Sequence, residues 1–291
     1  MIVTYAPGGV TDMVGRVISE KSQEFLGQPM VVINKAGAGG TLGMDFVAKS
    51  TPDGYTVGVS ATSTLAIAPA INPNLSYDPT KAFSYVCRQS ILSIVIMVRA
   101  DSPLNTLEKL IDFAKKNPGK LNYGSSGVGT ALHFAGELLN RAAGIKMVHV
   151  PFKGGAPALM ALLGGHIDLF FSNYTDAAEQ VKAGKVVPLA VSSSDRLVDL
   201  PNVLTVAQKG FPDAEFTSWL GINGPAGVSM PVLEKLSEFV KKVQLIPDVK
   251  KKMITLGVTP AHMGPREFEK FAKDQYLKVR DLAKAADIKL E

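Results

Sequence analysis

The sequence predicts an α/β protein of two domains, each with a largely parallel sheet covered by helices on both faces. The chain has 291 residues, which exceeds the roughly 100–200 of a single domain. Short β-rich runs alternate with helical stretches, as in a sheet of parallel strands joined by crossover helices. Two strand-like segments, Ser93–Pro103 and Thr217–Gly227, each end in a proline-containing turn and bracket a middle block. These three observations predict the fold class.

The expected elements follow from the apolar pattern, in chain order. The strands are predicted at Ile2–Tyr5, Met30–Ile33, Thr56–Ser60, Phe83–Gln89, Ile91–Val98, Leu121–Tyr123, Met147–Val150, Ile167–Phe171, Val186–Val191 and Phe216–Asn223. The helices between them are predicted at Asp12–Leu26, Leu107–Lys116, Ala131–Ala142, Ala156–Leu163 and Asp176–Ala183. After the second bracketing segment only helical patterns remain, at Val232–Val243, Val249–Leu256 and Arg266–Ala285.

The bracketing segments also predict how the two domains are divided. Lobe 1 is discontinuous and takes residues 1–100 and 225–291, whereas lobe 2 takes residues 101–224. Two crossing strands would then form the hinge. A chain that crosses twice favours a ligand cleft between the lobes that opens and closes.

Composition narrows the class of function. Hydrophobic residues make up 46% and charged residues 20%, as in a globular protein with a substantial core. The net charge of +5 favours anionic ligands. The single basic run, Lys250–Lys252, is interpreted as a solvated helix face, so no nucleic-acid partner is expected. The lone Cys87 is expected to be a buried small hydrophobe, because no sequence feature supplies a base for it.

The sequence contains no apolar stretch of about 18 residues, so we expect no membrane span. Met1 stands directly on the first predicted strand, and no leader peptide is present in the given chain. A leader that has been processed or cloned away is compatible with this start.

Two glycine-rich loops carry the expected chemistry. "APGGVTD" follows the first strand of lobe 1, and "GSSGVGTALH" (Gly124–His133) follows the first strand of lobe 2. Each loop leads into a helix, with Thr11 or Asp12 as the expected cap of the first and Thr130 of the second. Bare backbone N–H groups and a helix N-terminus attract anions, so the pair would form a split anion clamp. The alternative is that both loops are only tight turns into helices.

Competing motifs fail on spacing. "AGAGGTLG" (Ala36–Gly43) has glycines at G-x-G-x-x-x-G and lacks the acidic residue of a dinucleotide site. "GSSGVGT" lacks the lysine of a phosphate-binding loop, and Val128 replaces the closing glycine of G-x-S-x-G. The four histidines, His133, His149, His166 and His262, show no metal spacing. We therefore predict no catalytic residue, no cofactor and no metal. His149 and His166 are expected to be structural, and His133 to lie either on the helix surface or in the site.

Eight stretches together resemble one family. They are "APGGVTD", "LGQPMVVINKAGAGGTLG", "STPDGYTV", "NPGKLNYGSSGVGTALHFAGELL", "MVHVPFKGGAPALMALLGGHIDLFF", "AGKVVPLAVSSSDR", "LPNVLTVAQKGFP" and "SWLGINGPAG". In this order they resemble the Bug-type substrate-binding proteins of tripartite tricarboxylate transporters, over nearly the whole chain. The resemblance implies a two-lobed periplasmic-binding-protein (Venus-flytrap) fold, located in the periplasm. It also implies that the protein presents a small organic carboxylate to the membrane permease subunits.

The resemblance also implies site residues. In the family the ligand carboxylate is held by the loops after the first strand of each lobe, often with ordered water. That places Gly8 and Gly9 in one lobe and Ser125, Ser126, Gly129 and Thr130 in the other. Further residues are expected near these loops and are included in the prediction. The complete predicted ligand-binding set is Tyr5, Gly8, Gly9, Asp12, Thr62, Ser63, Ser125, Ser126, Gly129, Thr130, His133, Phe152 and Asn173.

Some positions depart from the family or have a competing interpretation. Tyr5 stands where the family often has phenylalanine, and Ser172 precedes Asn173 where the family often has aspartate. Phe152 and Trp219 are candidates for either the core or the cleft. Lys153 is expected to be a surface charge rather than a ligand contact.

Three functions from different classes fit the sequence. The leading prediction is a monomeric extracytoplasmic carboxylate receptor without catalysis. A hydrolase or transferase that uses the two anion loops is less favoured, because no nucleophile–base pair is evident. A ligand sensor feeding a signalling partner would share the same sequence pattern, and a neighbouring gene for a permease or a sensor kinase would separate the two.

Overall fold

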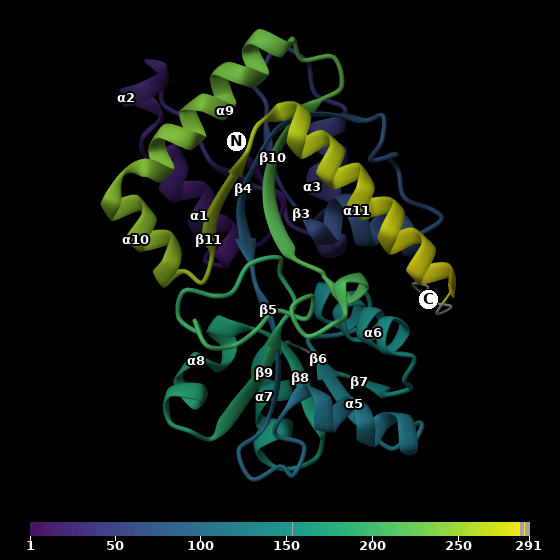
Figure 1. Ribbon diagram of the computed structural model, residues 1–291. Coiled ribbons are helices and arrows are strands. Elements are labelled where there is room, and N and C mark those ends of the chain that lie inside the picture. The colour runs from purple at the N-terminus through teal and green to yellow at the C-terminus, as the bar shows by residue number, and fades with distance from the viewer. Residues whose placement is uncertain (153, 286–287, 289–291) are drawn as a thin grey trace. The chain divides into compact units, whose positions relative to one another are not determined.

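The computed structural model describes residues 1–152, 154–285 and 288. Its contacts divide the chain into two compact units (Figure 1). Unit 1 comprises Met1–Ile91 and Trp219–Glu291, and unit 2 comprises Leu92–Ser218. The chain therefore passes from one unit to the other twice, near residues 91 and 218, rather than near 100 and 225 as the sequence predicts. The ligand cleft expected between the lobes stays a prediction.

Unit 1 is built on a six-stranded sheet of order β11-β4-β10-β3-β1-β2. Its strands are β1 (Ile2–Val3), β2 (Ile33–Asn34), β3 (Gly58–Ala61), β4 (Phe83–Leu92), β10 (Ser218–Pro225) and β11 (Thr259–Met263). β1 runs parallel to both β2 and β3, whereas β10 is antiparallel to β3 and β11 is antiparallel to β4. The carboxyl ends of β1 and β3 are thus neighbours at one edge of the sheet.

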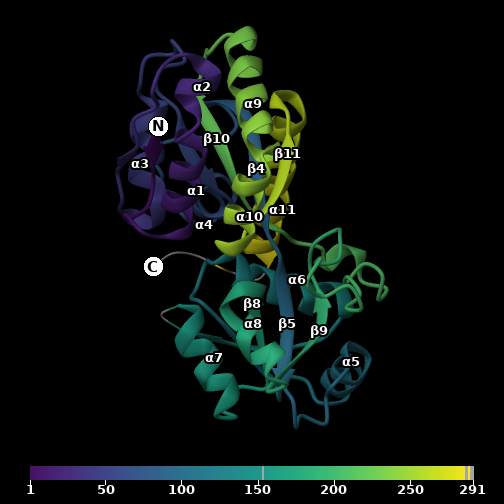
Figure 2. The same cartoon turned by 90° about the vertical axis from the view of Figure 1, so that its left-hand side faces the viewer.

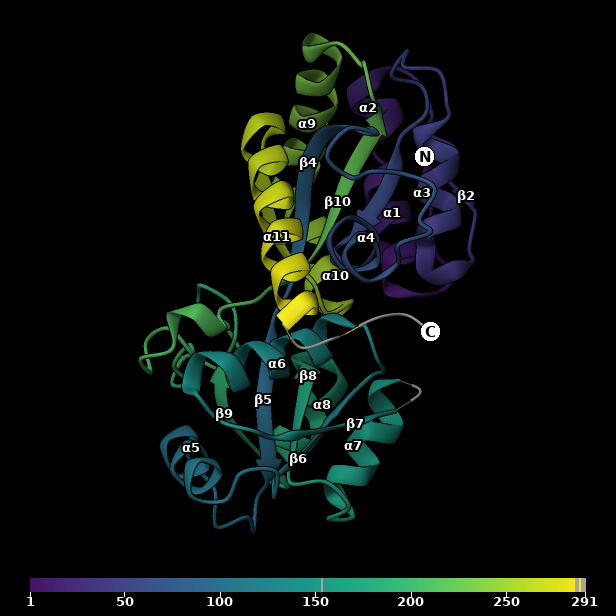
Figure 3. The ribbon, with the colours of Figure 1, turned by 90° about the vertical axis from the view of Figure 1, so that its right-hand side faces the viewer.

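Helices cover both faces of the unit 1 sheet. One group contains α1 (Val10–Ser19), α2 (Ser22–Leu26), α9 (Met230–Leu245) and α10 (Pro247–Thr255), which contact one another (Figure 2). The other contains α3 (Thr41–Ala48), the π-helical turn η2 (Ser63–Ile67), α4 (Ala68–Ile71) and α11 (Pro265–Ala285), which packs on η2 and α4 (Figure 3). Trp219 and Phe268 meet edge to face in the core between α11 and the sheet, with ring centroids 5.3 Å apart.

The turn before α3, which includes η1 (Ala38–Gly40), brings strand and helix together. A Cβ on Gly43 would lie 2.7 Å from the Lys35 carbonyl oxygen and 2.9 Å from the Thr4 Cα, so only glycine permits this approach. This confirms the interpretation of "GAGGTLG" as a structural turn.

Unit 2 is built on a five-stranded sheet of order β7-β6-β8-β5-β9. Its strands are β5 (Ile94–Arg99), β6 (Asn122–Ser125), β7 (Val148–Pro151), β8 (Leu169–Asn173) and β9 (Val186–Val191). β6 runs parallel to β7 and β8, while β5 is antiparallel to β8 and β9. The carboxyl ends of three adjacent parallel strands therefore gather at one edge.

In the described residues of unit 2, four helices and one short 3₁₀ turn accompany the sheet. They are α5 (Leu107–Lys116), α6 (Ala131–Ala143), α7 (Gly155–Leu163), α8 (Tyr174–Lys182) and η3 (Pro212–Ala214). α6 packs on β6, β8 and η3, whereas α7 and α8 pack on each other and on β8. Helices α6, α7 and α8 follow β6, β7 and β8 in turn, so their N-termini lie at the edge where those strands end.

The structure corrects several sequence predictions. The sheets are mixed rather than parallel, because β10 and β11 in unit 1 and β5 in unit 2 run against their neighbours. The helix predicted over Asp12–Leu26 is two helices, α1 and α2, separated at residues 20–21. The segment after β10 contains a strand, β11, as well as helices. Its run Thr259–Met263 includes a proline and a histidine, which hide the usual strand pattern.

Candidate anion-binding site

The N-terminus of α1 presents unpaired backbone N–H groups. Gly9 is the N-cap, with φ −75° and ψ 165°, and no side chain caps the helix. The first helical bond runs from the Met13 N–H to the Gly9 carbonyl. Within the described residues, the amides of Gly9, Val10 and Thr11 donate no hydrogen bond. The predicted cap by Thr11 or Asp12 is wrong, and the free amides leave room for an anion.

Asp12 does not cap the helix because its carboxylate is used to hold the preceding loop. Its oxygens accept hydrogen bonds from the Gly8 N–H at 2.9 Å, the Arg16 Nε at 3.0 Å and the Asn34 Nδ2 at 2.8 Å. These hydrogen bonds, with that of Arg16 the strongest, lower the pKa of Asp12 from 3.8 to about 2. Asp12 is only 2% exposed. The geometry thus favours a supporting role for Asp12 over direct ligand contact.

Asn34 is a supporting residue that sequence reasoning missed. Its Nδ2 also donates to the Tyr5 carbonyl at 3.1 Å, so one amide ties the loop after β1 to β2. The pairing of β1 with β2 puts Asn34 opposite Val3, at the start of the loop. A polar residue at the end of a neighbouring parallel strand was the available sequence signal.

Tyr5 and Ser63 lie together at the carboxyl ends of β1 and β3. Their hydroxyl oxygens are 2.5 Å apart. A Cβ on Gly40 would meet the Tyr5 ring at 3.0 Å, so the turn before α3 packs closely on this tyrosine. Burial raises the pKa of Tyr5, which keeps its hydroxyl protonated at neutral pH. The pair can therefore offer a neutral hydroxyl at the carboxyl ends of these two strands.

Thr62 and Trp219 form an internal contact. The Thr62 hydroxyl accepts a hydrogen bond from the backbone N–H of Trp219 at 2.8 Å, and the Thr62 side chain is 1% exposed. Trp219 itself is fully buried against Phe268. The geometry therefore indicates a structural role for both residues, and ligand contact by Thr62 stays a prediction.

In unit 2 the loop between β6 and α6 is stabilised by hydrogen bonds between its side chains and its own backbone. The Ser125 hydroxyl accepts from the Gly127 N–H at 3.1 Å, and the Thr130 hydroxyl donates to the Gly127 carbonyl at 2.8 Å. Thr130 is the N-cap of α6 and accepts from the His133 N–H, which confirms the predicted cap. Gly127 and Gly129 have φ of +139° and +73°, conformations that favour glycine.

The same loop keeps some amides free. The Gly129 N–H donates to the Nδ1 of His133 at 3.2 Å, so neither Gly127 nor Gly129 has an amide to spare. The amides of Ser126, Val128, Ala131 and Leu132 donate no hydrogen bond in the described part of the chain. An anion at the N-terminus of α6 would therefore bind the amides of the residues next to the glycines, and not the amides of Gly127 and Gly129.

His133 and His149 are stacked beneath this loop, although 16 positions separate them in sequence. Their ring centroids are 3.8 Å apart and the planes differ by 12°. Tyr123 also lies against His149, with ring centroids 4.9 Å apart. Burial is the main cause that lowers the pKa of both histidines, to about 3 for His149. Sequence reasoning treated the histidines as scattered and missed this pair.

The Ser125 hydroxyl lies 2.7 Å from Nε2 of His149, which overturns the expectation that no nucleophile–base pair exists. The arrangement is nevertheless poor for catalysis. Ser125 is fully buried, and the low pKa of His149 makes it a weak base at neutral pH. Among the described residues, no carboxylate hydrogen-bonds to the ring to orient it. The contact is therefore suited to fixing the loop.

Phe152 and Asn173 lie at the ends of β7 and β8, next to the same edge. Phe152 packs partly against the core cluster of unit 2 and meets Gly124, where a Cβ would come 3.4 Å from its ring. The Ser172 hydroxyl donates to the Asn173 carbonyl at 2.9 Å, and desolvation raises the pKa of Asp176 on the first turn of α8. Asp176 was not predicted. Lys153 lies outside the described residues.

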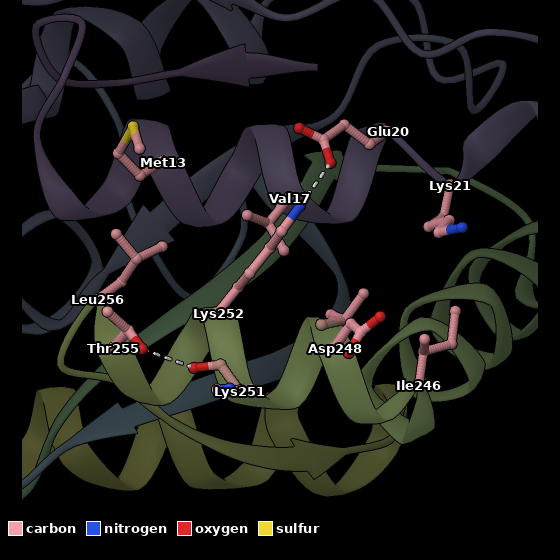
Figure 4. Close-up of a pocket in the computed structure, with 11 residues that line it drawn as sticks. Met13, Val17, Glu20, Lys21, Ile246, Asp248, Lys251, Lys252, Thr255 and Leu256 are labelled. Carbon is pink, nitrogen blue, oxygen red and sulfur yellow. Dashed lines mark hydrogen bonds and ion pairs between the residues drawn. The ribbon is translucent and has the colours of Figure 1, made fainter.

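A separate cavity of about 730 Å³ lies between α1 and α10 in unit 1 (Figure 4). Met13, Val17 and Leu256 form part of its wall, and an ion pair between Lys252 and Glu20 bridges it at 3.5 Å. It contains none of the predicted site residues. In the described residues no cluster of His, Cys, Asp or Glu could hold a metal ion, and no helix has the length and apolar character to cross a membrane.

The arrangement in each unit, an open α/β sheet with free helix N-termini at the strand ends, defines a ligand-binding protein of the periplasmic-binding-protein class. A solved structure of the periplasmic binding protein BugD has 32% identity and a TM-score of 0.76, covering 100% of this chain and 98% of that one. The model of the tripartite tricarboxylate transporter family receptor matches residues 14–288. The chain belongs to this family.

Individual relatives agree with this family. A UPF0065 protein from the tcbD-tcbE intergenic region of Pseudomonas sp. strain P51 is 36% identical over 265 residues, covering 91% of this chain and 79% of its own. MatC from Rhodopseudomonas palustris, solved with bound malate, has 30% identity, a TM-score of 0.74 and 97% coverage of both chains. An R. palustris protein solved with adipate has 28% identity and a TM-score of 0.79, covering 99% of this chain and 97% of that one.

The cap of α6 gives a test that separates stability from binding. We expect Thr130→Ala to cost about 1 kcal/mol of unfolding free energy, because the helix loses its cap, and to weaken ligand binding. Thr106 caps α5 in the same way and provides a control, since Thr106→Ala should cost similar stability and leave binding unchanged. Urea unfolding and calorimetric titration would measure the two effects. Equal affinities for both variants would contradict a binding role for the loop.

Proposed function

We propose that this protein is an extracytoplasmic receptor that binds a small organic carboxylate and delivers it to a tripartite permease. The observation that carries the proposal is the set of unpaired amides at the N-termini of α1 and α6. Such amides, together with the partial positive charge of a helix N-terminus, bind carboxylates without a side-chain cation. Membership of the receptor family and the malate and adipate in the two relatives support the same ligand class.

The protein is proposed to act as a monomer that binds one ligand. Arg16 is committed to Asp12 and Asn34, which argues against its use as the main partner of the ligand. Hydroxyls of Tyr5 and Ser63 would add neutral donors in unit 1. An unmatched buried charge is costly, so several such bonds, each worth about 1.5–3 kcal/mol, are needed to hold a carboxylate.

A thermal-shift screen of mono-, di- and tricarboxylates, including malate and adipate, tests the ligand class. The neutral diamide of adipate is a matched control of the same length. We expect at least one carboxylate to raise the melting temperature and the diamide to leave it unchanged. Calorimetry should then give a stoichiometry of one. Stabilisation by the diamide and the carboxylate alike would contradict recognition of a carboxylate charge.

We further propose that the protein has no turnover. The weak base His149 and the buried Ser125 support this, despite their contact. The bound carboxylate, recovered after long incubation, should be chemically unchanged. Chemical conversion that disappears in Ser125→Ala would instead establish an enzyme.

A further inference from the structure

The backbone of the β6–α6 loop (residues 126–130) is linked to the stacked histidines at two points, once directly and once through Ser125. The Gly129 N–H donates to Nδ1 of His133. The Ser125 hydroxyl, which accepts from the Gly127 N–H, contacts Nε2 of His149. Both glycines have positive φ and lie outside helix and strand, so their orientation depends on these contacts together with the bonds from Thr130 to the Gly127 carbonyl.

Protonation of His133 is incompatible with the bond from Gly129. A neutral imidazole whose Nδ1 accepts a hydrogen bond carries its proton on Nε2. The remaining lone pair is the one on Nδ1, so a second proton must go there. The new N–H would then face the Gly129 N–H at a contact that is now 3.2 Å, and the glycine would have to turn away.

The surroundings of the two rings keep them neutral in the present arrangement. Burial lowers the pKa of both, and His133, across the stack, lowers that of His149 further. Glu137, one turn further along α6, partly opposes this effect at His133, and its carboxylate accepts from the Tyr123 hydroxyl on β6. η3, which packs on α6, carries the exposed Asp213, while β8 presents the uncharged Phe171 to Tyr123.

We propose that His133, stacked on His149, is a positioning residue that holds the β6–α6 loop in its ligand-binding conformation only while its own ring is neutral. The protein would thus release its ligand more readily as the surroundings become acidic. This inference rests on the proposed function, because it assumes that the loop binds the carboxylate. It predicts a loss of affinity on protonation, whereas direct contact between a histidine cation and the carboxylate would increase affinity.

The first experiment needs no ligand. In ligand-free, isotope-labelled protein, NMR would follow the Gly129 amide and the His133 ring from pH 8 to pH 5. We expect the Gly129 resonance to move with the same midpoint as His133 protonation, below pH 6.5, and the movement to be absent in His133→Asn. Asparagine places an oxygen acceptor close to the Nδ1 position but does not titrate. A Gly129 amide that stays fixed while His133 protonates would overturn the inference.

The second experiment measures the affinities of the wild type and of His133→Asn for malate and adipate at each pH. Titration of the ligand affects both proteins equally, so it cancels in the ratio of the two affinities. The wild-type affinity should fall relative to the variant by up to about tenfold per pH unit once protonation begins. His262→Asn is the matched control, because His262 also contacts a serine, Ser237 at 3.0 Å, but lies in unit 1. It should retain the wild-type profile.

The outcomes distinguish the two claims. A wild-type affinity that rises relative to His133→Asn in acid would identify direct ligand contact and contradict positioning. If the ratio is independent of pH although His133 titrates, the inference is also wrong. If neither carboxylate binds at any pH, the proposed function fails for these ligands, and the Gly129 titration alone still decides whether His133 holds the loop.

Discussion

Gly9→Leu is expected to reduce carboxylate affinity by at least about 100-fold, through loss of two or more hydrogen bonds to a charged group. The backbone itself accepts a side chain here, since φ is −75° and a Cβ would meet only the Ala6 carbonyl oxygen at 3.7 Å. A larger side chain would instead occupy the space next to the free amides of Val10 and Thr11. Calorimetric titration of the variant measures the effect.

Gly264 provides the matched control for Gly9. It precedes α11 in the same unit, its carbonyl accepts the first helical bond from Phe268, and a Cβ added to it would meet no atom of the described residues within 4 Å. Gly264→Leu should therefore change folding stability about as much as Gly9→Leu and leave affinity unchanged. Wild-type binding by Gly9→Leu would show that the start of α1 does not receive the ligand.

Asp12→Ala should give the second large effect, on both stability and binding. Removing the carboxylate leaves the Gly8 N–H and one N–H of the Asn34 amide without an acceptor, which costs about 2 kcal/mol of unfolding free energy. The loop after β1 then loses its anchor, and affinity should fall. Chemical unfolding and calorimetry measure both quantities.

The pH dependence provides an independent check on Asp12. Its folded pKa of about 2 lies below the ordinary value of 3.8, so its contribution is complete above pH 4 and is lost as pH falls towards 2. The difference in unfolding free energy between wild type and Asp12→Ala should shrink over that interval. Asp45→Ala, which breaks a similar contact with Lys49 on α3, should leave affinity unchanged. Unchanged affinity in Asp12→Ala would assign Asp12 to stability alone.

The fold class and most elements could be predicted from sequence because local patterns determine them. α5 (Leu107–Lys116) and β9 (Val186–Val191) match their predicted bounds. Strand direction could not be predicted in the same way, since it depends on which strands pair at long range. β10 and β5, whose antiparallel pairings make the two sheets mixed, show no sequence feature that sets their direction.

The candidate site was predictable as two loops but not as a set of atoms. The glycines and Thr130 were evident from the turn and cap chemistry of their types. The roles of Asp12 and Asn34 depend on the pairing of β1 with β2, and the stack of His133 on His149 depends on the pairing of β6 with β7. Such contacts depend on tertiary structure, so the residue types could be recognised in the sequence but their hydrogen-bonding and stacking partners could not.

A crystal structure with the carboxylate selected by the thermal-shift screen would show which groups of the protein hold the ligand. We expect carboxylate oxygens at hydrogen-bonding distance from amides at the start of α1, such as those of Val10 and Thr11, or at the start of α6. We also expect that Arg16 remains paired with Asp12. A carboxylate bound to the Arg16 guanidinium, with both sets of amides unused, would contradict this expectation.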